Sequence, residues 1–118
     1  MDTTKNTVKL CLYASTTDKI HGRLFYEHIV LRARDEGLSG ATARRGIMGY
    51  GASSKIHTSK FWELTEKLPV VITIIDEEDK IEAFYKSIET DLLEMQKGCL
   101  VTKEMVEVKL HKTGEKMK

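Results

Sequence analysis

The chain has 118 residues, and its 19 lysines and arginines nearly balance its 18 aspartates and glutamates, for a formal net charge of +1. Nucleic-acid-binding proteins usually carry a basic excess on one face, so this balance argues against a DNA or RNA partner. The length fits one domain, since single domains commonly hold about 100–150 residues. We expect a single domain over residues 1–118, with a folded part at 7–110 and a polar tail at 111–118.

No hydrophobic run reaches the roughly 18 residues that suggest a membrane-spanning helix. The first residues are polar and lack the apolar segment of a secretory signal. The two cysteines, Cys11 and Cys99, have no C-x-x-C spacing, and Cys11 lies in an apolar run that suits a buried free thiol. Together these features predict a cytoplasmic protein.

The first part of the chain predicts a strand, a helix and a second strand. Residues 8–13 alternate between two partly apolar faces, which is typical of a strand. Residues 23–36 carry apolar side chains at helical spacing, and Gly37 follows at a position that favours a left-handed helix cap. Residues 41–48 predict a second strand, weakened by a glycine.

A long connection follows at residues 49–60, and the aromatic-rich residues 61–65 predict a further extended segment. Pro69 then precedes residues 70–75, a strand that is apolar on both faces. A sheet with one wet face would alternate between polar and apolar residues instead. One face should contact helices, and a second subunit is the simplest candidate for the other.

A second helix is indicated by a narrow apolar stripe at steps of three and four residues. Asp76 is its expected N-cap, with acidic residues in the first turn, and Gly98 is expected to end it. Residues 106–110 alternate as a last strand. The stripe consists of Ile81, Phe84, Tyr85, Ile88, Leu92 and Met95.

The elements follow the order β-α-β-β-α-β, which is the split βαβ or ferredoxin-like arrangement. The sequence therefore predicts an α+β sandwich, in which two helices pack on one face of a four-stranded antiparallel sheet.

Two loops could carry function. The first is the glycine-rich run at residues 37–57, where Gly46, Gly49 and Gly51 would let the backbone approach a ligand closely. The basic and hydroxyl side chains in this run suit an anion such as a phosphate, namely Arg45, Ser53, Ser54 and Lys55. The spacing fits neither a Walker A loop nor a dinucleotide fingerprint. A mobile connection that needs glycines for turning explains the composition equally well.

The second loop contains Asp18, His21 and Gly22, ahead of the first helix. A metal cluster of His21 and His57 with Asp18 is an alternative, although no histidine pair has the spacing of a strong metal site. His28 and His111 are expected to be ordinary surface residues.

Catalysis has less support. Ser53 or Ser54 could join His57 and Asp76, but no nucleophile-elbow pattern surrounds either serine. Neither cysteine has a supporting base in view. We therefore expect a protein that is not an enzyme.

At these motifs the sequence resembles the uncharacterised PII-like family of bacterial and archaeal proteins. The matching residues span most of the chain, from about 7 to 110. They include Asp18-Lys19-x-His21-Gly22, Gly37-Leu38-x-Gly40-Ala41-Thr42, Arg45-Gly46-Ile47-Met48-Gly49-Tyr50-Gly51, Ser53, Ser54, His57 and Leu68-Pro69-Val70-Val71 running into Asp76 and Glu77.

The resemblance implies a homotrimer with a ferredoxin-like, PII-like fold. It also implies kinship with PII signalling proteins, which bind adenine nucleotides in clefts between subunits. In those proteins a long loop contacts a transporter, channel or enzyme, and residues 49–60 occupy its position here.

The leading hypothesis is thus a trimeric PII-like regulator that binds a small anion, with an adenine nucleotide as the first candidate, and acts on a membrane transporter or channel. Ligand binding would order residues 49–60. The alternative is a metal-binding trimer like the copper-tolerance relatives of this fold, with His21 and His57 as ligands. The expected ligand-binding residues are Asp18, His21, Gly22, Arg45, Gly46, Gly49, Tyr50, Gly51, Ser53, Ser54 and His57.

Overall fold

Four strands make one antiparallel sheet in the computed structural model, which describes residues 1–51, 56–58 and 67–115. The strands lie side by side in the order β4-β7-β1-β8. The central strands β1 and β7 pair along their whole length. In chain order the four are β1 (Thr7–Ser15), β4 (Thr42–Arg45), β7 (Pro69–Glu77) and β8 (Leu100–Val106).

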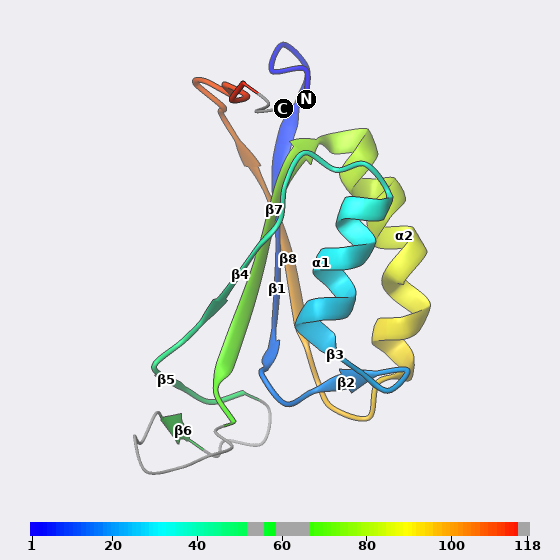
Figure 1. The fold of residues 1–118 in the computed structure, drawn as a ribbon, viewed down its shortest axis with the longest axis vertical. Coiled ribbons are helices and arrows are strands. Elements are labelled where there is room, and N and C mark those ends of the chain that lie inside the picture. The colour runs from blue at the N-terminus through cyan, green and yellow to red at the C-terminus, as the bar shows by residue number, and fades with distance from the viewer. Residues whose placement is uncertain (52–55, 59–66, 116–118) are drawn as a thin grey trace.

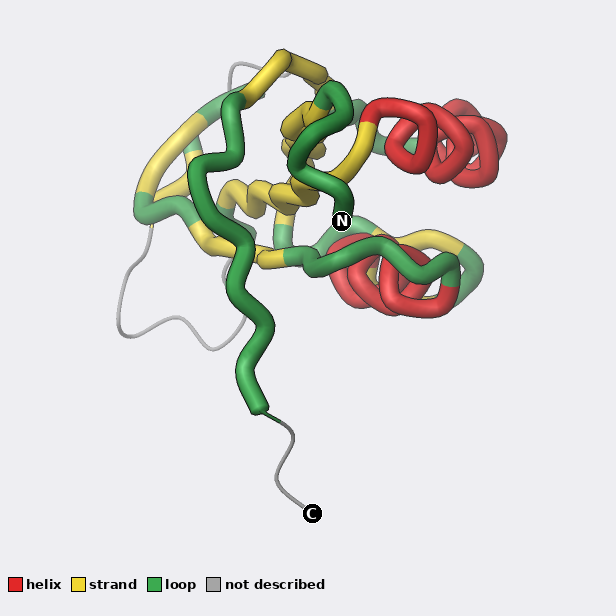
Figure 2. Tube along the Cα trace, turned by 90° about the horizontal axis from the view of Figure 1, so that it is seen from above, coloured by secondary structure: helices red, strands yellow, loops and turns green. Residues whose placement is uncertain are grey.

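Two helices, α1 (Phe25–Asp35) and α2 (Glu78–Glu94), lie together on one side of this sheet (Figures 1 and 2). Helix α1 connects β1 to β4, and α2 connects β7 to β8. The predicted ferredoxin-like fold is therefore confirmed. Two short hairpins are added to it at the same end of the molecule (Figure 1). They pair β2 (Lys19–Ile20) with β3 (Arg23–Leu24) and β5 (Met48–Gly49) with β6 (His57–Thr58).

The core lies between the sheet and the helices. It contains the apolar residues that recur at every second position in the strands and at every third or fourth position in the helices. Alternate residues of β1 and β7 face the helices, and register places them opposite one another, as Leu10 opposite Ile74 and Leu12 opposite Ile72. The apolar stripe of α2 meets them, as predicted. The largest fully buried side chains are Phe25, Phe84, Leu12, Ile29, Ile72, Ile74, Ile81, Ile88, Val8 and Asp76.

Helix α1 is terminated as the sequence predicts, by Gly37, which lies just past its end and has a φ of +80°. The Gly37 N–H donates to the carbonyl of Arg34, and the Leu38 N–H donates to the carbonyl of Ala33, both at 3.1 Å. This pair of bonds is the Schellman motif, which satisfies carbonyls that the helix end leaves open. Glycine adopts the left-handed conformation without the steric cost of a Cβ.

The predicted ends of α2 are wrong. Asp76 is not its N-cap, because β7 stays paired with β1 through Glu77 and the helix begins one residue later, without a side-chain cap. Asp76 is instead buried, and its carboxylate accepts hydrogen bonds from the backbone N–H groups of Ser39 at 2.8 Å and Glu77 at 2.7 Å. The helix ends at Glu94, four residues before Gly98.

Other predicted boundaries also differ from the observed ones, because strand pairing decides where these elements begin and end. The last strand is Leu100–Val106 rather than 106–110, since β1 offers partners only from Tyr13 opposite Leu100 to Thr7 opposite Val106. Helix α1 begins two residues later than predicted, because the residues before it pair in β3. The second strand is shorter than 41–48. The extended segment predicted at 61–65 lies outside the described residues.

The face of the sheet that points away from the helices has no described helix over it (Figure 1). Val71, Thr73 and Ile75 of β7 lie on it half-buried, and Cys11 is buried there as a free thiol, 3.7 Å from the Thr73 hydroxyl. The two-sided strand is therefore confirmed, and a second subunit on this face stays a prediction. None of the helices in the described ranges is long and apolar enough to cross a membrane.

Replacing Ile72 by alanine should lower the free energy of unfolding by about 2–5 kcal/mol, because it would leave a cavity in a fully buried position. Leu93→Ala is the matched control, since that side chain is 79% exposed and its loss should change the free energy by no more than about 0.5 kcal/mol. Urea unfolding of both variants measures the difference. Equal losses would contradict the assigned core.

Candidate functional site

Part of the glycine-rich run is held against Pro69, at the start of β7. We call residues 46–51 the glycine segment. The Gly46 N–H donates to the Pro69 carbonyl at 2.7 Å. A Cβ at Gly49 would lie only 2.8 Å from Cγ of Pro69, and one at Gly46 would lie 3.2 Å from Pro69 Cβ. Both glycines therefore permit a close approach between the segment and the proline ring.

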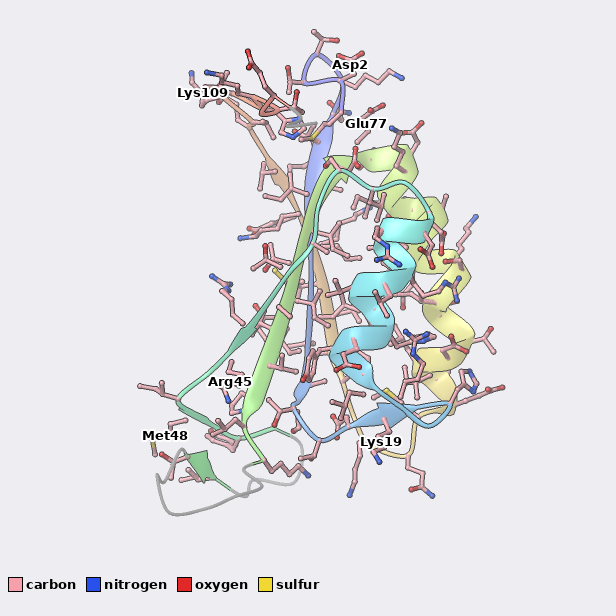
Figure 3. All side chains as sticks on the ribbon, in the orientation of Figure 1. Asp2, Lys19, Arg45, Met48, Glu77 and Lys109 are labelled. Atoms are coloured by element: carbon pink, nitrogen blue, oxygen red, sulfur yellow. The ribbon has the colours of Figure 1, made fainter. Side chains whose placement is uncertain are left out.

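The residues at both ends of the glycine segment are exposed to solvent. Arg45 is the last residue of β4, pairs with Val70 and has an exposed side chain (Figure 3). It forms no ion pair with any described residue. Tyr50 is 71% exposed, and nothing lies within 4 Å of a Cβ built on Gly51. An exposed cation, an exposed aromatic ring and an accessible backbone therefore lie close together in the sequence.

The remaining predicted residues of this loop are only partly described. Backbone pairing places His57 opposite Gly49, across the β5–β6 hairpin. Ser53, Ser54 and the side chain of His57 lie outside the described part of the chain, so their assignment to the site stays a prediction.

Asp18 has a structural environment. It is 5% exposed, and its Oδ2 accepts a hydrogen bond from the Ser15 N–H at 2.9 Å. Its backbone carbonyl accepts the Phe25 N–H at 2.7 Å. Asp18 thus connects the end of β1 to the start of α1, on either side of the β2–β3 hairpin.

His21 and Gly22 form the turn of that hairpin. Their φ values are +50° and +77°, the left-handed conformation that a two-residue type I′ turn requires at both central positions. The turn directs the His21 ring toward α2, where its Nε2 lies 2.9 Å from Oδ1 of Asp91. The hairpin is thereby attached to the second helix.

Asp91 and His28 are the site residues that sequence reasoning missed. His28 was expected on the surface, but it is buried, and its Nε2 lies 3.2 Å from Oδ2 of Asp91. Arg32 approaches the same oxygen at 3.9 Å. The signal was present, since His28 follows the buried Phe25 by three residues and therefore shares its helix face.

The carboxylate of Asp91 thus lies close to two imidazole rings and a guanidinium group. The hydrogen bond from His21 lowers the pKa of Asp91 below its ordinary value of 3.8, and the bond from His28 adds to this effect, while partial burial opposes it. An ionised carboxylate accepts from two N–H donors more strongly than a protonated carboxyl group does, so the cluster favours a charged Asp91.

A cavity of about 500 Å³ lies beside this cluster. The β2–β3 hairpin with the residues before it forms one wall, and the last turn of α2 with the residues after it forms the other. Its lining residues are Thr17, Asp18, Lys19, Ile20, His21, Asp91, Glu94, Met95, Gln96 and Lys97.

The metal alternative gains no support. In the residues that the structure describes, no three His, Cys, Asp or Glu side chains are placed to hold a metal ion. His21 directs Nε2 at Asp91, and His57 is described by its backbone alone. Metal binding by these two histidines remains an untested prediction.

The acidic start of α2 is occupied by contacts within the chain. Glu77 accepts a hydrogen bond from the Asp2 N–H at 3.0 Å, and the ammonium groups of Lys5 and Lys80 lie 3.4 and 3.5 Å away. These contacts lower the pKa of Glu77, the Asp2 bond most of all. The carboxylate therefore stabilises the N-terminal segment.

Solved proteins with this arrangement place the fold in the PII-like class. CPII, a nitrogen regulatory PII-like protein from Thiomonas intermedia K12 bound to ADP, AMP and bicarbonate, matches 87% of this chain and 90% of its own, with a TM-score of 0.59 and 13% identity. A putative PII-like signaling protein (TTHA0516) from Thermus thermophilus matches 86% of this chain and 90% of its own, with a TM-score of 0.56 and 10% identity.

Sequence comparison gives the family. Residues 7–108 match the DUF190 family, described as Uncharacterized ACR, COG1993. A UPF0166 protein from Aquifex aeolicus (strain VF5) is 39% identical over 99 residues, which cover 84% of this chain and 90% of the relative. UPF0166 protein MJ1524 from Methanocaldococcus jannaschii is 40% identical over 72 residues, covering 61% and 66%. The chain belongs to the DUF190 family, which confirms the predicted membership of an uncharacterised PII-like family.

Asp91→Asn should lower the free energy of unfolding at pH 6, where the native carboxylate is charged. Because the folded-state pKa is depressed, the charge stabilises the protein fully above about pH 3.8, and this stabilisation is lost as the pH falls through the lower folded pKa. The difference between wild type and variant should therefore shrink in acid. Urea unfolding at a series of pH values tests this. Asp35→Asn is the control, because its exposed pair with Arg34 should contribute little at any pH.

Proposed function

We propose that this protein is a PII-like regulator that binds an adenine nucleotide at the glycine segment, in a cleft formed between subunits. The observation that supports this most is an exposed Arg45, without an ion pair among the described residues, close in sequence to the open backbone at Gly51. A guanidinium group can donate two parallel hydrogen bonds to a phosphate. The likeness in fold to CPII, which was solved with ADP and AMP, agrees with this ligand class.

Each part of a nucleotide has a candidate partner near the segment. Arg45 would contact the phosphates, and the open backbone at Gly51 would let them approach closely. The exposed ring of Tyr50 could stack on the base, since aromatic side chains bind bases through their faces. Ser53, Ser54 and His57 would complete the site from the loop beyond.

A homotrimer would supply the second wall of the cleft. The sheet face opposite the helices carries half-buried Val71 and Ile75 and is 40% exposed at Tyr13. Packing this face against other copies would bury apolar surface, which stabilises association. It would also bring the ends of neighbouring sheets together.

Regulation, rather than catalysis, fits the residues around the segment. Ile47, Met48 and Ile56 expose 82, 60 and 56% of their surfaces, and exposed apolar groups of this kind mark surfaces that bind other proteins. Nucleotide binding beside this surface would change how it meets its partner. A membrane transporter or channel is the partner class that the family resemblance suggests.

Arg45→Ala should weaken nucleotide binding by roughly ten- to a hundredfold, the cost of losing a hydrogen bond to a charged group. Calorimetric titration of the purified oligomer with ATP, ADP and AMP, with and without magnesium, measures the affinity. Arg34→Ala is the matched control, because this exposed arginine pairs with Asp35 at the far end of α1.

Sedimentation should show trimers for wild type and both variants. A wild-type protein that binds no nucleotide in this panel would overturn the proposed function. Equal affinities of wild type and Arg45→Ala would overturn the assigned site.

A further inference from the structure

The β2–β3 hairpin is attached to α2 by the His21–Asp91 contact, across one side of the cavity described above. That cavity, of about 500 Å³, leaves space between the hairpin and the end of α2. Asp91 also receives His28 from α1, so one carboxylate fixes the hairpin relative to both helices. Without it, the hairpin would have room to shift.

The hairpin is connected in turn to the end of β1. Ile20 anchors it in the core, with 4% exposure. Asp18 precedes it and accepts the Ser15 N–H through its side chain, while the Asp18 N–H donates to the Ser15 carbonyl at 3.1 Å. A shift of the hairpin would therefore displace Ser15 and its neighbour Thr16.

Thr16 contacts the residues just before β7. Its N–H donates to the Leu68 carbonyl at 2.8 Å, and the Leu68 N–H donates to Thr16 Oγ1 at 3.1 Å. Leu68 is 4% exposed, so these reciprocal bonds lie in a place where an unpaired backbone group is costly.

Pro69 follows Leu68 and supports the glycine segment directly, through the Gly46 N–H bond and the contact of its ring with Gly49. A continuous set of contacts thus runs from Asp91 to the glycine segment. The C-terminal end of α2 and the strand β5 lie at the same end of the molecule (Figure 1).

We propose that Asp91 is a positioning residue for the glycine segment, acting through the hairpin, Asp18, the Thr16–Leu68 bonds and Pro69. By fixing the hairpin, Asp91 sets where Gly46 and Gly49 lie. This inference rests on the proposed function, because the position of the glycine segment matters there for nucleotide binding. Its own test needs no nucleotide.

Amide hydrogen exchange in the ligand-free protein provides the test. In Asp91→Ala, the Thr16 and Gly46 N–H groups should exchange about tenfold faster than in wild type, relative to amides of the β1–β7 ladder, because local opening of this set becomes easier. Glu82→Ala is the matched control. It removes another carboxylate of α2 from a contact with a cation, Lys103, but lies outside the set.

A double-mutant cycle tests the route. Thr16→Val removes the acceptor of the Leu68 N–H and should accelerate exchange at Gly46 by itself, whereas Thr16→Ser keeps the hydroxyl and should behave as wild type. Adding Asp91→Ala to Thr16→Val should then change Gly46 exchange little, since both changes act on one connection.

Three results would overturn the inference: unchanged Gly46 exchange in Asp91→Ala, acceleration of all amides by one common factor, or independent effects in the double variant. A wild-type protein that binds no nucleotide would leave the exchange result intact and remove only the proposed function. Nucleotide binding with unchanged Gly46 exchange in Asp91→Ala would remove only this inference.

Discussion

The pairing of β1 with β7 is the interaction on which the rest of the structure depends. Its register sets alternate residues of both strands against the helices, so that Leu10 and Ile74 share the core while Cys11 and Thr73 face away. A slip of one residue would turn every side chain to the opposite face. Both helices and both outer strands take their places from this ladder, because α1, α2, β4 and β8 each contact one of the two strands or the core they form.

The same ladder explains why segments far apart in sequence lie together. Ser15 pairs with Pro69, so the chain leaves β1 at the point where it enters β7. The loop carrying Asp18 and the segment before β7 therefore lie at one end of the sheet, where Thr16 and Leu68 exchange hydrogen bonds. The glycine segment, which follows β4 on the other side of β7, is positioned by the same proline.

Prediction from sequence worked where one local rule acted alone. Periodicity identified the apolar stripe of α2, and Gly37 identified the end of α1. Prediction failed where pairing overrode a local signal. Asp76 is a favoured N-cap residue, yet β7 remains paired past it, and the alternating residues 106–110 lie beyond the length of β1. His28 was misplaced because a polar side chain on an apolar helix face needs a partner, and its partner, Asp91, is 63 residues away.

By itself the sequence determined the order of the two helices and the four strands of the main sheet, the ferredoxin-like class, the PII-like resemblance and the two loops rich in candidate residues. The order, the class and the loops follow from periods of 2 and 3.6 residues and from glycine and proline positions, which are local properties of the chain. The PII-like resemblance rests instead on family motifs spread from about residue 7 to 110. Only the tertiary structure decided that Asp18 is a buried connector, that His21 binds Asp91 and that Pro69 supports Gly46 and Gly49. These arrangements depend on strand register and helix packing, and no local pattern in a sequence specifies such a distance.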